Sequence, residues 1–92
     1  MIYNIVCEIT EENTAGSFEA RLTLLCRDKC QYASNAWFVD YAGDRKDLFS
    51  NLREVLTNND TLIVNNIDFN SMAGWLPGNV IDWIKNHPQA ND

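Results

Sequence analysis

The chain has 92 residues, of which 46% are apolar, and it carries a formal net charge of -6 at pH 7. This length suffices for one domain, and the apolar content together with three tryptophans excludes a disordered chain. No stretch approaches the roughly 18 apolar residues of a membrane span, and no signal segment follows Met1. We therefore expect a folded cytoplasmic protein.

The excess of acidic residues disfavours nucleic acid as a partner, because affinity for a phosphate backbone comes mainly from Lys and Arg. It does not exclude one, because several basic residues could gather into a local patch after folding. These residues are Arg21, Arg27, Lys29, Arg45, Lys46 and Arg53. The more ordinary interpretation, which we favour, is a solvated surface.

Three cysteines, Cys7, Cys26 and Cys30, cannot all pair within one chain, and an odd number fits a reducing compartment. With His87, the single histidine, they have the atoms for a zinc site. Their spacing is not that of a zinc knuckle, however, and His87 stands beside Pro88 near the end of the sequence, where chains tend to fray. The sequence favours free thiols.

The first predicted element is a strand from residue 2 to about residue 10, because "IYNIVCEIT" alternates between two faces. Tyr3, Ile5 and Cys7 share one face. The stretch "EENTAGS" predicts a turn, with the next element starting near Ser17 as an N-cap. Residues 18–33 fit both a helical period and a period of two, and residue propensities favour a helix with a stripe that includes Cys26 and Cys30. A short extended piece is expected at residues 31–33.

The second half gives clearer signals. "NAWFVDYA" predicts a strand, and a helix follows it, with Asp44 as N-cap and Asp47 in the first turn. Its apolar stripe consists of Leu48, Phe49, Leu52, Val55 and Leu56. "TLIVNNIDF" predicts another strand, and "GNVIDWIKNH" predicts a short C-terminal helix with Asn79 as N-cap and Pro88 as its stop. Asp40, Asp44, Asp47 and Asp60 are interpreted as strand-end, capping and turn residues.

This order of elements is βαββαβ, which predicts an α+β ferredoxin-like fold: an antiparallel sheet with two helices on one face, plus the short C-terminal helix. We expect a single domain over residues 1–88 and a tail at residues 89–92. The second face of the sheet would be apolar, with Ile2, Val6, Phe38, Ile63 and Ile67. Because such a face is unfavourable in water, we predict a homodimer.

The stretch "AWFVDYAGDRKDLFSNLREVLTNNDTLIVNNID", with "AGWLPGNVIDWIKNH" after it, resembles the small SinR-like proteins, relatives of the CRISPR-associated Cas-two family. The resemblance covers residues 36–87, and its motifs are mostly core pattern. It implies a ferredoxin-like homodimer. In the nuclease members of that family, an aspartate at the end of the first strand binds the metal ion. Glu8, in "VCEIT", takes that place here, with a side chain longer by one methylene group.

Two function hypotheses stay open. The first is a non-catalytic interaction module: a small acidic homodimer, linked to mobile-element or defence functions, that binds another protein and needs no cofactor. Trp75 and Trp83 are its candidate anchors, although packing in the domain's own core is the alternative interpretation, which we favour for Trp83. The second is a Cas-two-like metal-dependent nuclease or nucleic-acid-binding protein, with Glu8 as the candidate catalytic and Mg²⁺-binding residue at the dimer axis.

A thiol enzyme is a third option. Cys26 or Cys30 would need a lowered thiol pKa to act as a nucleophile. On one helix face, two cysteines four residues apart are more often buried and inert. Whether the protein is an enzyme is therefore not decided by its sequence.

Overall fold

The computed structural model describes residues 1–88, so the expected tail at residues 89–92 lies outside the described part of the chain. The elements are β1 (Ile2–Glu8), α1 (Glu12–Leu25), β2 (Asp28–Ala33), β3 (Ala36–Asp40), α2 (Arg45–Arg53), β4 (Thr61–Asn66), the short 3-10 helix η1 (Phe69–Ser71) and α3 (Gly78–Lys85). The four strands form one antiparallel sheet in the order β2-β3-β1-β4. This topology confirms the predicted ferredoxin-like α+β fold with an additional C-terminal helix.

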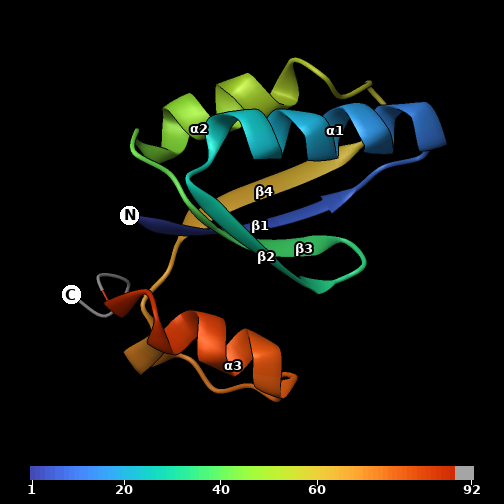
Figure 1. The fold of residues 1–92 in the computed structure, drawn as a ribbon. Helices are drawn as coiled ribbons and strands as arrows, with labels where there is room; N and C mark the ends of the chain where they lie inside the picture. The colour runs from blue at the N-terminus through green and yellow to red at the C-terminus, as the bar shows by residue number, and fades with distance from the viewer. Residues whose placement is uncertain (89–92) are drawn as a thin grey trace.

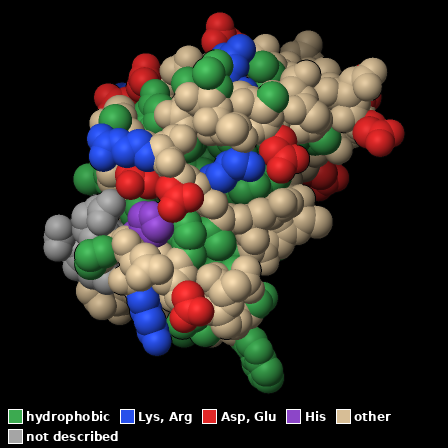
Figure 2. All heavy atoms as spheres, in the orientation of Figure 1, with side chains coloured by type: hydrophobic (Ala, Val, Ile, Leu, Met, Phe, Trp, Pro, Cys, Tyr) green, Lys and Arg blue, Asp and Glu red, His purple; other side chains and the backbone are tan. Residues whose placement is uncertain are grey.

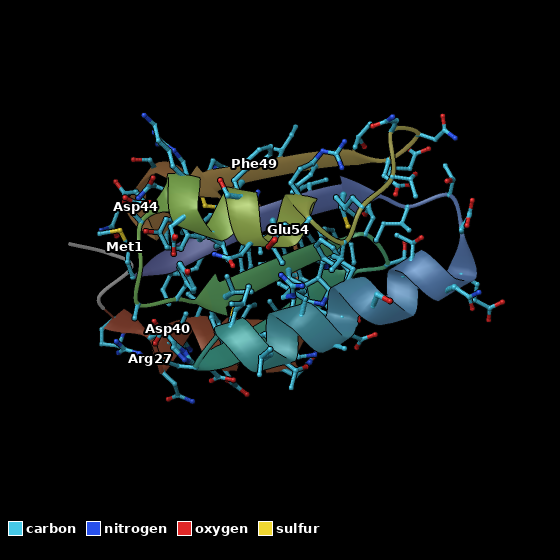
Figure 3. The ribbon with its side chains drawn as sticks, turned by 90° about the horizontal axis from the view of Figure 1, so that it is seen from above. Met1, Arg27, Asp40, Asp44, Phe49 and Glu54 are labelled. Atoms are coloured by element: carbon cyan, nitrogen blue, oxygen red, sulfur yellow. The ribbon has the colours of Figure 1, made fainter. Side chains whose placement is uncertain are left out.

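The sheet separates two layers of helices. Helices α1 and α2 lie side by side on one face, and α3 lies on the opposite face (Figures 1 and 3). None of the helices described in residues 1–88 has the length and apolar content needed to cross a membrane.

The main core fills the space between the sheet and helices α1 and α2. The alternation of β1 sends its odd-numbered residues to this side, and the helices contribute residues spaced one turn apart. The most buried members are Tyr3, Ile5, Cys7, Phe18, Leu22, Trp37, Val39, Tyr41, Leu48 and Leu52. Within this core the rings of Phe18 and Trp37 lie 5.6 Å apart between centroids.

A second apolar cluster lies on the other face of the sheet, under the C-terminal segment. Ile2, Phe38 and Val80 form its buried centre, and Ile67 and Trp83 are among the partly buried residues packed on it. The C-terminal segment of the same chain thus covers part of the sheet face that we expected a second copy of the protein to cover. On that face Ile63 keeps 61% of its surface exposed, and Val6 beside it is partly buried.

Helix α1 differs from its prediction at both ends. It begins at Glu12, so "EENTAGS" is mostly helical and Ser17 lies inside the helix instead of capping it. It ends at Leu25, and Cys30 belongs to β2. The reason is tertiary: residues 28–33 obtain their backbone hydrogen bonds from pairing with β3, which outweighs their helical pattern. The extended piece expected at residues 31–33 is thus part of a longer strand.

Helix α2 begins as predicted, because the Asp44 side chain accepts a hydrogen bond of 2.8 Å from the backbone N–H of Asp47. Leu48 and Leu52 are fully buried, whereas Phe49 is 40% exposed. The N-cap of helix α3 lies two residues earlier than expected, at Pro77. Asn79 is therefore not its cap, because the Pro77 carbonyl accepts the first backbone bonds of the helix.

Candidate functional site

Glu8 lies at the end of β1 and is exposed. Its backbone is paired with Thr61 of β4, and Glu8 lines a cavity of about 300 Å³ together with Glu19 from α1. Within residues 1–88, no group of three or more His, Cys, Asp or Glu side chains is arranged to hold a metal ion. A single chain thus places two carboxylates, Glu8 and Glu19, at this cavity. Glu19 is already paired with Lys29 at 3.6 Å.

Trp37 lines the same cavity from β3 and was not singled out by its sequence pattern. It is 6% exposed, and its indole Nε1 is buried without a hydrogen-bond partner in the described structure. A buried N–H group without a partner costs free energy. In the sequence Trp37 is one more aromatic residue of a strand, and only its surroundings in the fold reveal the unsatisfied group.

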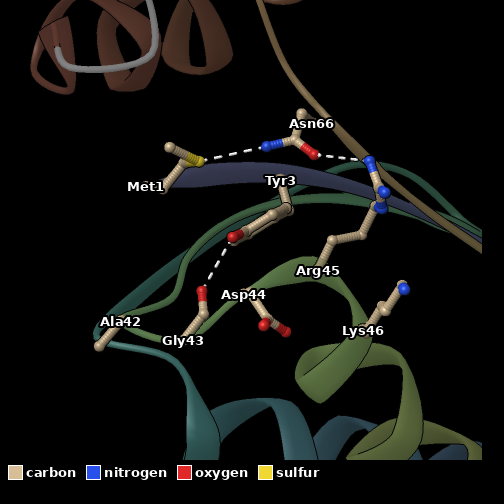
Figure 4. A pocket seen from close by; sticks show the side chains of 8 residues that line it. All are labelled: Met1, Tyr3, Ala42, Gly43, Asp44, Arg45, Lys46 and Asn66. Carbon is tan, nitrogen blue, oxygen red and sulfur yellow. Dashed lines mark hydrogen bonds between the residues drawn. The ribbon is translucent and has the colours of Figure 1, made fainter.

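A larger hollow of about 580 Å³ lies at the start of α2 (Figure 4). Arg45 and Lys46 line it together with Tyr3 and Asn66, and the acidic residue Asp44 lines it as well. Arg45 donates to Asn66 Oδ1 at 3.1 Å, and the Tyr3 hydroxyl donates to the Gly43 carbonyl at 2.8 Å. The carboxylate of Asp44, the N-cap of α2, lies at the positive end of the helix dipole and compensates it. The hollow therefore has mixed charge rather than the character of a phosphate site.

Two of the basic residues make local polar contacts. Arg21 pairs with Glu54 at 3.2 Å, and Arg53 donates to the Leu56 carbonyl and to Asn58. On the face shown in Figure 2, Lys and Arg side chains are scattered among acidic ones. This distribution agrees with the interpretation of a solvated surface.

The three cysteines occupy different parts of the fold. Cys7 and Cys26 belong to the main core, and Cys30 packs in the second cluster on the opposite face of the sheet. Burial raises the pKa of Cys7 and Cys26 to about 11 and also raises that of Cys30. The thiols are free, but the shared helix face expected for Cys26 and Cys30 is wrong, because a strand begins between them.

The two candidate tryptophans have opposite environments. Trp75, in the segment between η1 and α3, is 99% exposed. Trp83 packs on the second cluster, where its ring stacks at 6.4 Å from Phe38. Its indole N–H donates to Asp28 Oδ2 at 3.1 Å. Trp75 is thus a tryptophan available to a partner, whereas Trp83 holds α3 on the sheet.

Comparisons with known proteins inform the fold. No family model matches the chain, and neither does any curated protein. Among solved structures, the chain is similar to the crystal structure of a hypothetical protein TT1823 from Thermus thermophilus, with 16% sequence identity and a TM-score of 0.54. The match covers 83% of this chain and 93% of that protein. At this level of identity, the similarity shows a shared ferredoxin-like fold and carries no activity to this chain.

Proposed function

We propose that the chain is a non-catalytic interaction module that forms a homodimer and binds a protein partner through Trp75. The observation that carries the proposal is the 99% exposure of Trp75 in a fold that buries most of its other aromatic side chains. Full burial of a tryptophan removes about 150–250 Å² from water, which corresponds to about 4–6 kcal/mol before the entropic costs of binding. Met72, 47% exposed and three residues before it, adds further apolar surface.

The partner-binding role is tested by comparing purified wild-type protein with Trp75→Ala as bait. A specific partner should be retained by the wild type and by Ile81→Ala, a matched loss of an exposed apolar side chain on α3, and it should be lost with Trp75→Ala. Ile81 is 41% exposed, so its truncation removes surface without disturbing the core. Equal capture by all three proteins would contradict the proposal.

The homodimer is supported by the part of the sheet that α3 leaves uncovered. Ile63 is 61% exposed on β4, and β4 is an edge strand with β1 as its neighbour in the sheet. An open edge beside an apolar side chain favours association with a second chain. The ferredoxin-like homodimer implied by the SinR-like resemblance is consistent with this surface.

Light scattering tests the dimer directly. We expect a mass of twice the 10.5 kDa of the chain for the wild type, and a shift toward the monomer for Ile63→Lys. Leu24→Lys is the matched control, because Leu24 is 80% exposed on α1, on the other face of the sheet. A monomeric wild type, or an unchanged mass of Ile63→Lys, would overturn the dimer.

A Cas-two-like metal-dependent nuclease is the second candidate, and the position of Glu8 favours it. Its carboxylate is exposed at the end of β1, the position that the resemblance implies for the metal ligand. In a dimer two copies could hold Mg²⁺ through oxygen atoms and water. Glu8→Gln should then abolish Mg²⁺-dependent cleavage of DNA or RNA, while Glu12→Gln, an exposed change at the start of α1, should not. Cleavage that persists in Glu8→Gln, or that needs no metal, would exclude this role.

A further inference from the structure

His87 makes two polar contacts just beyond the end of α3. Its ring Nδ1 lies 2.6 Å from the backbone carbonyl oxygen of Trp83, and its Nε2 lies 3.1 Å from Oδ2 of Asp28 on β2. The histidine side chain is only 13% exposed. These contacts connect the C-terminal segment to an edge strand of the sheet.

Both partners of the imidazole ring are acceptors. A carbonyl oxygen and a carboxylate oxygen have no proton to donate, and a neutral imidazole carries a single N–H group. Only the protonated ring, with an N–H on each nitrogen, satisfies both contacts at once.

Two further features favour a positive charge at this position. The ring stacks on the indole of Trp83, with centroids 3.7 Å apart and planes inclined by 21°, and an aromatic face attracts a cation. The Trp83 carbonyl also belongs to the last turn of α3, which is the negative end of the helix dipole. Each feature loses its favourable contribution when the ring becomes neutral.

Asp28 is the residue of the sheet that makes polar contacts with the C-terminal segment. Its Oδ2 accepts the indole N–H of Trp83 as well as the contact from His87. The apolar contacts of Val80 and Trp83 with Phe38 do not depend on protonation. The polar contacts at Asp28 thus add a proton-dependent part to an otherwise apolar docking surface.

Other titratable groups lie around this surface. Cys30 and Tyr32 of β2 pack in the same cluster, and burial raises the pKa of each, so both stay neutral near pH 7. Next to η1, the Asp68 carboxylate accepts hydrogen bonds from the Asn70 backbone N–H and the Ser71 hydroxyl. Asp82 and Lys85 are the charged residues on α3 itself.

We propose that His87 and Asp28 form a proton-linked clasp that holds α3 against the sheet and weakens as the pH rises through the range in which histidine loses its proton. When α3 is docked on the sheet, the protonated His87 ring donates to two acceptors, the Trp83 carbonyl and the Asp28 carboxylate. When the segment is detached, the ring lies in water. Raising the pH therefore favours the open form, and the surface over Ile2 and Phe38 becomes more accessible.

Hydrogen exchange of the α3 backbone amides at pH 5.5 and pH 8, corrected for intrinsic exchange rates, tests the clasp. We expect the protection of α3 in the wild type to fall about tenfold relative to that of β1, as for the loss of one hydrogen bond to a charged group. His87→Gln should show no such pH dependence, and Asp28→Asn should show a smaller one than the wild type, because the contacts of the ring with Trp83 remain. His87 is the only histidine, so His87→Gln removes every imidazole from the protein. The N-terminal amine is present in both proteins, and its contribution cancels in the difference between them.

Two results would overturn the proposal. One is equal relative protection of α3 at both pH values in the wild type. The other is an equal pH response in the wild type and His87→Gln, which would assign the response to another group. Asp28→Asn distinguishes a specific contact from a general helix-end effect, because it keeps the histidine and an acceptor for Trp83 while it removes the negative charge.

Discussion

Asp60 and Thr10 connect the turn before β4 to the end of β1: Oδ1 of Asp60 accepts hydrogen bonds from the backbone N–H and from the hydroxyl of Thr10, at 2.9 and 3.1 Å. The other carboxylate oxygen accepts the backbone N–H and the hydroxyl of Thr57, at 2.7 and 3.0 Å. The bond from the Thr57 backbone, followed by that from Thr10, lowers the Asp60 pKa from 3.8 to about 2. One side chain thus holds together two segments fifty positions apart.

Asp60→Asn should lower the stability of the protein above pH 4 and should matter progressively less in acid. Because the folded state depresses the pKa, the carboxylate contributes stability above the unfolded value of 3.8, and that contribution disappears as the pH falls toward 2. Urea unfolding at pH 6 and at pH 2.5 measures it. The stability difference between wild type and variant should shrink at the lower pH.

Asp82→Asn is the control for that experiment, since it removes an exposed carboxylate on α3. It should change stability little at either pH. A difference between wild type and Asp60→Asn that is the same at both pH values would contradict the role assigned to the ionised carboxylate.

Leu22→Ala and Leu24→Ala should have very different effects, although the two residues are only two positions apart on α1. Leu22 is fully buried and Leu24 is 80% exposed. Truncation of the buried leucine should cost about 2–5 kcal/mol of unfolding free energy, whereas the exposed change should stay within about 0.5 kcal/mol. Chemical denaturation measures both. Equal losses would indicate that both leucines face the core, as the period-two pattern of residues 18–26 suggests.

The fold was predictable wherever a segment's local pattern agrees with its surroundings. Helix α2 has an N-cap at Asp44 and leucines one turn apart, and both signals lead to the same helix. Residues 26–33 carry a helical stripe instead, and only the pairing of Asp28 with Asp40 and of Cys30 with Phe38 makes them a strand. The helical pattern of residues 26–33 does not report this pairing, because the pairing depends on β3, the next strand along the chain, and not on the propensities of residues 26–33 themselves.

The surroundings of the candidate site residues were less predictable, for the same reason. Exposure distinguishes Trp75 from Trp83, and in the sequence both are aromatic residues of one segment near Pro and Gly. The contact of His87 with Asp28 joins residues 59 positions apart, so nothing near His87 in the sequence indicates it. Trp37 likewise reveals its unpartnered N–H only in three dimensions.

Two glycines should respond to alanine in opposite directions. Gly16 lies inside α1, and an added Cβ would meet nothing within 4 Å. Gly16→Ala should therefore stabilise the protein by about 0.5–1 kcal/mol through the helix propensity of alanine. At Gly43 an added Cβ would lie 2.7 Å from Cε2 of Tyr41, whose ring is fixed by a hydrogen bond from its hydroxyl to Asp47.

Gly43→Ala should accordingly destabilise the protein by about 1–3 kcal/mol, the typical cost of overpacking. Thermal unfolding of the two variants beside the wild type gives the sign of each effect. A stabilised Gly43→Ala would mean that the tyrosine ring moves freely, which would contradict its fixed position between the strand and α2.

The three thiols should react slowly with an alkylating reagent in the folded protein. Burial raises the pKa of Cys7 and Cys26 from 9.0 to about 11, so at pH 8 each has a thiolate fraction about 100-fold below that of the unfolded chain. Mass spectrometry of each site, in buffer and in denaturant, measures the ratio of labelling rates. Cys30, with more of its surface accessible, should react faster than Cys7. Fast labelling of Cys26 in the folded protein would instead indicate a thiol with a lowered pKa, which burial in a core does not produce. That result would restore the hypothesis of a thiol enzyme.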